Sequence, residues 1–236
     1  HRVDRRQRQM CIRDRDMGVS YICTSGEKLP HYIESITSAH PIESTFLRGI
    51  VDALNAEVAL GSVTSLDDGI SWLGFTYLFT RLCKAPRVYG LDAHDFEADP
   101  TLTQRRRQWI TYAANILAQH QMIEFDLAAG TLRPTNMGRI ASRYYLSHKT
   151  VGIFHERLRN NLVEADALSL MSRAADFDQI PLRESEEEEL TSLLESVPCE
   201  VDGGTATAPG KVNILLQAHI SYLYVDDFAL VSDMRY

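Results

Sequence analysis

Residues 99–134 decide the fold, and they read DPTLTQRRRQWITYAANILAQHQMIEFDLAAGTLRP. The opening Asp-Pro pair is typical of a helix start, and the apolar residues that follow recur at helical spacing. Two short runs with the composition of β-strands, 122–125 and 131–134, then flank a turn that ends in Gly130. This stretch therefore predicts a long helix followed directly by a β-hairpin.

Two further helices are expected before this segment. Apolar residues keep helical spacing over 46–60, and Gly61 is a suitable end for that helix. The next helix begins at the S-x-x-D box of Ser65 and Asp68 and ends before Pro86. Three helices followed by a hairpin are the order of a winged-helix module.

The rest of the chain predicts mostly helices. A helix starts at Asn136, another starts near Asp226, and helical spacing recurs between them at about 150–161, 164–176, 183–197 and 210–222. Near the N-terminus, a short strand at 19–23 and a helix at 27–37 form one α/β unit. The expected fold class is mainly α: a winged helix of three helices plus a β-hairpin, followed by a partial helical bundle, with a short α/β remnant at the N-terminus.

We expect four segments along the chain. Residues 1–16 show no hydrophobic period, and we interpret them as a non-native or disordered tail. Residues 17–43 hold the α/β remnant. Residues 44–148 then form the winged helix, and residues 149–236 form the helical bundle.

The chain of 236 residues has a formal net charge of −8, which argues against a simple nucleic-acid-binding protein. The charge is unevenly distributed, because residues 164–236 contain four basic and fifteen acidic side chains, whereas residues 104–163 contain nine basic and three acidic ones. Six arginines of this basic zone are candidates for phosphate contact: Arg105, Arg106, Arg107, Arg133, Arg139 and Arg143. Three arginines on one helix also pair readily with acidic side chains, so a purely structural role for the first three stays open.

Several kinds of site are not expected. The four cysteines stand far apart without a C-x-x-C pair, which argues against a zinc site or a disulfide framework and suits the cytosol or the nucleus. No glycine-rich phosphate loop or G-K-[ST] motif is present, so we assign no catalytic, cofactor-binding or metal-binding residue. No apolar run approaches the ~18 residues of a membrane span, so no membrane partner is expected.

Seven sequence blocks follow one another in a characteristic order. They are Pro41–Ser44, Leu54–Glu57, Ser71–Leu78, Pro86–Gly90, Asp99–Pro100, Gly138–Ser142 and Lys211–Gln217. In order and spacing these blocks resemble the large Ski-like superfamily 2 RNA helicases, over about residues 19–236. Within that family the resemblance is greatest to the spliceosomal U5 snRNP type, in its N-terminal cassette, and next to the activating signal cointegrator and ribosome-quality-control type.

The resemblance implies a fragment of an ATP-dependent RNA helicase. Residues 17–43 would be the end of a second RecA-like motor domain, and residues 149–236 a Sec-type helical domain that stops before the ratchet helix of the family. The fragment itself would hold no cofactor, because ATP and magnesium bind to the motor domains of the parent. It would serve as a brace and channel wall for that motor, with Asn55 and Glu57 contacting the motor domains.

The resemblance also implies partners and a location. RNA, the motor domains of the same parent chain and spliceosomal proteins are the expected partners, and unwinding of U4/U6 RNA in the nucleus is the expected reaction. The alternative is a cytoplasmic helicase of the cointegrator or ribosome-quality-control type. An alternative from another class is a free-standing winged-helix adaptor that binds nucleic acid or protein, although the unpaired strand at 19–23 argues against it.

Overall fold

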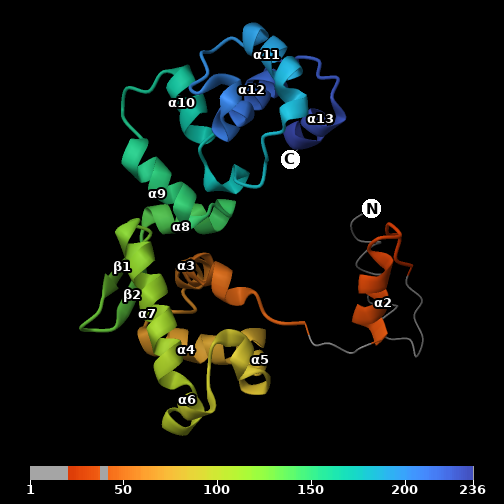
Figure 1. The fold of residues 1–236 in the computed structure, drawn as a ribbon. Coiled ribbons are helices and arrows are strands. Elements are labelled where there is room, and N and C mark those ends of the chain that lie inside the picture. The colour runs from red at the N-terminus through yellow and green to blue at the C-terminus, as the bar shows by residue number, and fades with distance from the viewer. Residues whose placement is uncertain (1–20, 38–41, 236) are drawn as a thin grey trace, which may run out of the picture. The chain divides into compact units, whose positions relative to one another are not determined.

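The computed structural model describes residues 21–37 and 42–235 of the chain (Figure 1). The interpretation of residues 1–16 as a tail lies outside the described residues. By its internal contacts the chain divides into two units, 1–43 and 44–236. The mainly α class is confirmed, since the described residues form helices throughout and one two-stranded sheet.

The first unit contains the described helix α2 (Leu29–Thr37), whose side chains are all exposed. Residues 21–25 have no regular secondary structure, so the strand expected at 19–23 is wrong for its described part. A strand is stable only where a neighbouring strand takes up its hydrogen bonds, and residues 21–37 contain no such neighbour.

The winged helix begins with α3 (Ile50–Leu60), which follows a short 3-10 helix, η1 (Phe46–Gly49). The expected helix end at Gly61 is confirmed. Its φ of 81° lies in the left-handed region, and its amide donates to the Val58 carbonyl at 3.1 Å. Glycine adopts this conformation without the steric strain that a Cβ causes, so it ends the helix at this point.

The second expected helix is divided into α4 (Leu66–Gly74) and α5 (Tyr77–Lys84). Thr76 makes the break, because its hydroxyl donates to the Leu73 carbonyl (2.7 Å) and accepts from the Phe79 amide (3.4 Å). The same side chain therefore closes one helix and caps the next.

The S-x-x-D box at the start of α4 is confirmed. Ser65 Oγ accepts from the Asp68 amide at 3.2 Å, and Asp68 Oδ2 accepts from the Ser65 amide at 3.0 Å. Asp68 Oδ2 also accepts from the Thr64 hydroxyl (2.8 Å) and the Thr64 amide (3.0 Å). These hydrogen bonds, above all the one from the Thr64 side chain, lower the pKa of Asp68.

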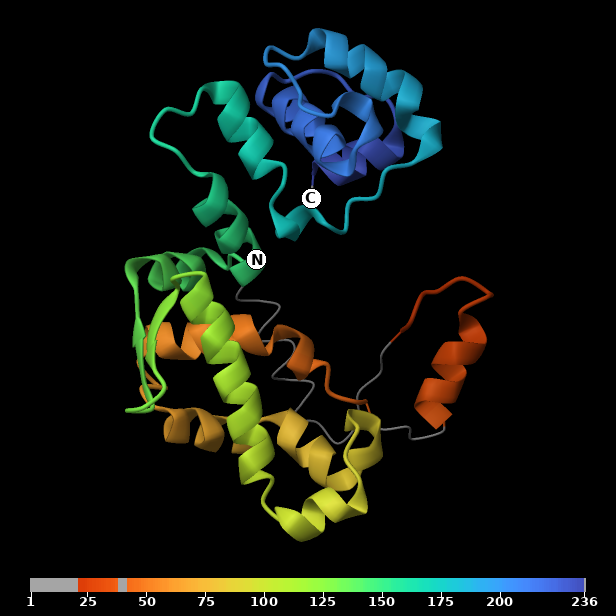
Figure 2. The same ribbon diagram turned by 60° about the vertical axis from the view of Figure 1, so that its left-hand side comes forward.

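The long helix α7 (Thr103–Gln119) starts later than expected. The segment before it contains the 3-10 helix η2 (Pro86–Tyr89) and the short α6 (Ala93–Ala98). Asp99 still satisfies a donor in the first turn of α7, because its Oδ2 accepts from the Gln104 amide at 2.6 Å. In both views α7 runs from α6 to the start of β1 (Figures 1 and 2).

The expected hairpin is confirmed as the antiparallel strands β1 (Ile123–Asp126) and β2 (Thr131–Pro134). The segment before α4 pairs with the outer edge of β2, where the Leu132 amide donates to the Thr64 carbonyl at 2.9 Å. The hairpin is thereby joined to the helical part of the winged helix, and its position relative to α4 is defined.

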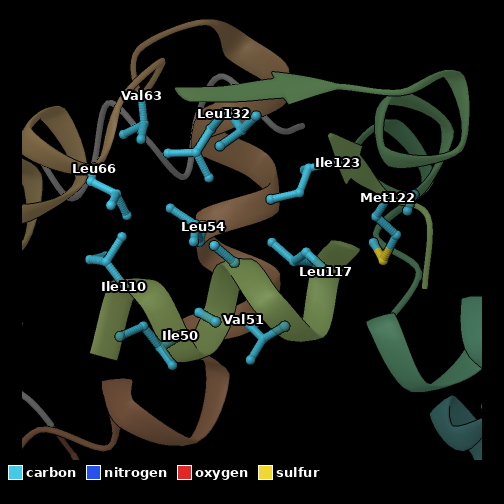
Figure 3. Close-up of a cluster of buried hydrophobic side chains, with 14 of the residues drawn as sticks. Ile50, Val51, Leu54, Val63, Leu66, Ile110, Leu117, Met122, Ile123 and Leu132 are labelled. Atoms are coloured by element: carbon cyan, nitrogen blue, oxygen red, sulfur yellow. The ribbon is translucent and has the colours of Figure 1, made fainter. Parts of the chain in front are cut away.

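One hydrophobic core joins α3, α4, α7 and the hairpin. Figure 3 shows Leu54 of α3 and Ile110 and Leu117 of α7 beside Ile123 and Leu132 of the hairpin. Burying a side chain of this size stabilises the fold by about 1.5–3 kcal/mol. Packing of these side chains, rather than the small sheet, therefore holds the winged helix together.

A helical bundle forms the rest of the second unit. Its elements are α9 (His148–Arg157), α10 (Glu164–Met171), η3 (Ala175–Phe177), η4 (Glu184–Glu186), α11 (Glu187–Ser196), η5 (Gly204–Ala206), α12 (Ala208–Ile220) and α13 (Phe228–Met234), whereas α8 (Asn136–Tyr144) packs on α3 and β2 and belongs to the winged helix. Helix α12 lies in the middle and contacts α10, α11 and α13 (Figure 1). Of the described helices, none has both the length and the apolar character that a bilayer span requires.

Candidate nucleic-acid interface

The six candidate arginines lie in two groups. Arg105, Arg106 and Arg107 are near the start of α7, whereas Arg133 lies on β2 and Arg139 and Arg143 lie on α8. A helix of 17 residues is about 25 Å long, and α8 lies near the opposite end of α7 (Figure 1). The six side chains therefore do not form one continuous surface.

Arg106 holds the winged helix together from within. Its guanidinium donates to the Ile70 carbonyl at 2.5 Å and to the Thr101 carbonyl at 3.1 Å, and it lies 4.9 Å from the centre of the Phe79 ring. A side chain with three such contacts is not free to bind a phosphate. Arg106 therefore links α7 to α4 and α5.

The neighbours of Arg106 are also engaged, but less firmly. Arg105 lies 5.6 Å from the centre of the Trp109 ring and donates to Gln108 Oε1 at 3.3 Å. Arg107 pairs with Asp67 at 2.8 Å, and both of these side chains are exposed. An exposed ion pair stabilises a protein by only about 0–1 kcal/mol, so a polyanion can displace Asp67 at little cost.

The second group is free by comparison. Arg133, Arg139 and Arg143 are all exposed, and within residues 21–37 and 42–235 neither Arg133 nor Arg139 has a hydrogen bond or ion pair through its side chain. Arg139 and Arg143 are four residues apart in α8 and share one side of the helix. The Arg143 guanidinium lies 6.0 Å from the centre of the Tyr144 ring, which is 65% exposed.

We call Arg139, Arg143 and Tyr144 the α8 face. Free guanidinium groups bind phosphate oxygens through paired N–H donors, and an exposed aromatic ring provides a surface on which a base stacks. The α8 face combines both kinds of group, with Arg133 on the preceding strand. Its chemistry therefore fits a single-stranded nucleic acid.

The backbone around Gly138 fixes the position of the α8 face. Thr135 caps α8 by accepting from the Gly138 amide at 3.1 Å, and its hydroxyl also donates to the Met122 carbonyl at 2.9 Å. A Cβ on Gly138 would lie only 2.0 Å from the Met122 carbonyl oxygen. Helix α8 thus packs against the segment between α7 and β1 at a distance that glycine alone permits.

Asn55 does not lie on the surface expected to contact a motor domain. It is 2% exposed, and its Nδ2 donates to the Gly138 carbonyl at 3.0 Å. The expectation is corrected for this residue, because its polar group joins α3 to α8 inside the winged helix. Glu57 is half-buried and its carboxylate accepts from the Ser62 hydroxyl, so its contact to a motor domain stays a prediction.

A buried charge cluster in the bundle was not expected from the sequence. Lys211 Nζ donates to Glu186 Oε2 (2.5 Å), Asp233 Oδ2 (2.7 Å) and the Pro181 carbonyl (2.8 Å), and Lys211 and Glu186 have no exposed surface. Arg183 pairs with the same two carboxylates. The signal in the sequence is the lysine itself, which lies in the first turn of a helix that is otherwise largely apolar. The cluster is a structural feature of the bundle, because its members point at one another.

Two family models match the chain. Residues 43–118 match a Winged Helix-turn-helix domain, and residues 134–236 match the Sec63 Brl domain. These matches agree with the winged helix and the helical bundle described above, and together they cover most of the second unit.

Several named proteins are similar to the chain. The RQC trigger complex helicase SLH1 of Saccharomyces cerevisiae is 44% identical over 220 residues, and the Activating signal cointegrator 1 complex subunit 3 of Homo sapiens is 40% identical over 221 residues. The DExH-box ATP-dependent RNA helicase DExH14 of Arabidopsis thaliana is 38% identical over 220 residues. Each similarity covers 93% of this chain and 10–11% of the relative, so the chain spans about a tenth of their length. The chain is therefore homologous to the winged-helix and Sec63-type region of the Ski-like superfamily 2 helicases, as its sequence blocks indicated.

Proposed function

We propose that this chain is the winged-helix and Sec63-type part of an ATP-dependent RNA helicase of the SLH1 and cointegrator-subunit type. The observation that supports it is the similarity over 93% of the chain to relatives of that type. None of the relatives reported above has a name that refers to splicing, so U4/U6 unwinding and spliceosomal partners stay predictions without further support. A cytoplasmic location goes with the proposed type, and a nuclear one with the splicing type.

In this proposal the chain supports a motor rather than acting as one. The sequence contains no phosphate loop of the G-K-[ST] kind, so ATP and magnesium would bind to motor domains of the same parent protein. The winged helix has a packed hydrophobic core and backbone hydrogen bonds that join it to its hairpin, which suits a brace. RNA would contact the parts of its surface where positive charge is free.

The α8 face, with Arg133, is the RNA contact that the geometry favours. Its arginines are exposed and largely unpaired, whereas Arg106 is held by backbone carbonyls and Arg107 by Asp67. Of the six arginines expected to contact phosphate, we therefore retain Arg133, Arg139 and Arg143. Of the three arginines on α7, Arg107 is the best remaining candidate, because RNA can displace Asp67 from its exposed ion pair.

The test compares two double variants of the 236-residue chain in binding to labelled single-stranded RNA. Arg139→Gln/Arg143→Gln removes two charges from the α8 face, and Arg105→Gln/Arg107→Gln removes two from α7. A single strand loses about 0.7 in the slope of log K against log salt for each phosphate contact removed. We expect the α8 variant to lower the slope by about 1.4 and the α7 variant to change it little. The reverse result would place the RNA on α7, and no RNA binding by the unmodified chain would refute the proposed contact altogether.

A further inference from the structure

A second concentration of positive charge lies in the bundle, outside the six candidate arginines. The end of α9, the segment 158–163, α10 and Arg173 just beyond it line an open hollow of about 680 Å³. The groups in its lining that can donate hydrogen bonds are Arg157, Arg159, Asn160, Asn161, Ser169 and Arg173. We call this site the basic hollow.

Two of its arginines are free. Arg157 and Arg159 are exposed, and in the part of the chain that the structure describes their side chains have no hydrogen bond or ion pair. Arg173 is paired with Asp202, so its charge is partly offset. Asp166 is the one acid in the lining, and its carboxylate accepts from the Val163 amide at 3.3 Å, where it caps α10.

The positive charge of the basic hollow lies in a domain that is otherwise acidic. Residues 149–236 contain seven basic and sixteen acidic side chains. Arg183 and Lys211 form ion pairs within the buried cluster. Three of the remaining five basic side chains line the basic hollow. An acidic surface repels a polyanion, so an anionic ligand that approaches this domain is concentrated at the hollow.

We infer that the basic hollow binds the phosphate groups of a single RNA strand, as a contact additional to the α8 face; this inference rests on the RNA-binding function proposed above. Arginine binds phosphate through two parallel N–H donors, and the amide groups of Asn160 and Asn161 supply neutral donors for sugar or base. The volume is within the ~300–1,000 Å³ typical of sites for small ligands, so the hollow admits a nucleotide unit rather than a duplex.

The experiment measures binding of a fluorescein-labelled oligouridylate to the 236-residue chain by anisotropy over a series of salt concentrations. The variant Arg157→Gln/Arg159→Gln removes both free charges of the basic hollow. The matched control, Lys149→Gln/Arg235→Gln, removes two exposed charges from the same domain outside the hollow, so both variants have the same net charge. We expect the hollow variant to reduce the salt slope by about 1.4 and the control to leave it nearly unchanged.

Three results would overturn the inference. Equal slopes in the hollow variant and the unmodified chain would show that RNA does not use the hollow, and a loss confined to the Arg139→Gln/Arg143→Gln variant would then leave the proposed function standing. Equal losses in the hollow variant and the control would show an effect of overall charge. Polyglutamate competing as strongly as RNA of equal charge for the unmodified chain, but not for the hollow variant, would assign the hollow to an acidic protein segment instead.

Discussion

Replacing Lys211 with methionine tests whether the buried charge cluster stabilises the bundle. The cluster contains two cations, Lys211 and Arg183, and two anions, Glu186 and Asp233, so its charges balance. Methionine keeps the unbranched shape of the side chain but removes the charge and the donor to the Pro181 carbonyl. Glu186, which has no exposed surface, is then left in the interior with one cation in place of two.

Breaking a buried ion pair by removing one partner costs about 3–5 kcal/mol. In a domain of roughly 100 residues each kcal/mol shifts the melting temperature by about 4–8 °C, so the melting temperature of the bundle should fall by at least about 12 °C. Both tryptophans, Trp72 and Trp109, lie in the winged helix. Tryptophan fluorescence should therefore report little change, while far-ultraviolet circular dichroism shows an early loss of helix.

The double variant Lys211→Met/Glu186→Leu decides whether charge balance is the cause. It removes one cation and one anion and leaves the Arg183–Asp233 pair, whose atoms lie 2.8 Å apart. Replacing a buried ion pair by apolar side chains of similar volume is often neutral or stabilising. The double variant should therefore be more stable than Lys211→Met alone. If the double variant loses as much stability as Lys211→Met and Glu186→Leu lose together, the reasoning from charge balance is refuted.

Acid unfolding gives an independent check. Burial by itself raises the pKa of Asp233, but hydrogen bonds from Arg183 and Lys211 outweigh it, and the pKa is lower than the ordinary value of 3.8. A carboxyl whose pKa is lower in the folded state contributes stability above pH 3.8 and loses it as the pH falls through the folded pKa. Without Lys211 one of the two donors is gone, so the bundle should begin to unfold at a higher pH.

Three further predictions concern the winged helix. Gly138→Ala places a Cβ 2.0 Å from the Met122 carbonyl oxygen and should lower the free energy of unfolding, obtained from urea titrations followed by tryptophan fluorescence, by about 1–3 kcal/mol, whereas Gly49→Ala, which meets open space, should not. Burial, and then the charges of nearby histidines, lower the pKa of His120. The stability that neutral His120 contributes should therefore be complete above pH 6.5 and decrease below it, and His120→Gln should flatten this dependence in thermal scans from pH 7 to 5. Arg106→Met should cost about 1.5–3 kcal/mol in stability while leaving the salt slope of RNA binding unchanged, and a reduced slope would contradict its structural role.

The elements that the sequence predicted correctly depend on neighbouring residues. The capping box of Ser65 and Asp68, the stop at Gly61 and the hairpin around Gly130 are each determined within a few positions. The apolar periodicity of α7 likewise predicts its long buried face. These signals suffice for the order of helices and hairpin, and hence for the winged-helix architecture.

The features that the sequence did not predict depend on residues far apart in the chain. Arg106 is engaged because the Ile70 carbonyl, 36 residues before it, accepts its hydrogen bond. Asn55 is buried because the Gly138 carbonyl, 83 residues away, accepts its hydrogen bond. Periodicity cannot reveal such pairs, because the arginine and the asparagine taken alone have the character of ordinary surface residues.

The number of charged residues in a stretch of sequence does not locate the candidate site either, because it does not show which charges are paired in the fold. Residues 104–163 are one basic zone in the sequence, yet backbone carbonyls hold Arg106 and Asp67 holds Arg107. In the acidic bundle, Arg183 and Lys211 are paired with carboxylates of the buried cluster. The positive charge that a ligand can reach is therefore smaller than the number of basic residues in the sequence suggests. A polyanion responds to guanidinium groups that are both exposed and unpaired. Exposure and the lack of a partner, rather than local composition, therefore select the α8 face from the six candidates and add Arg157 and Arg159 to it.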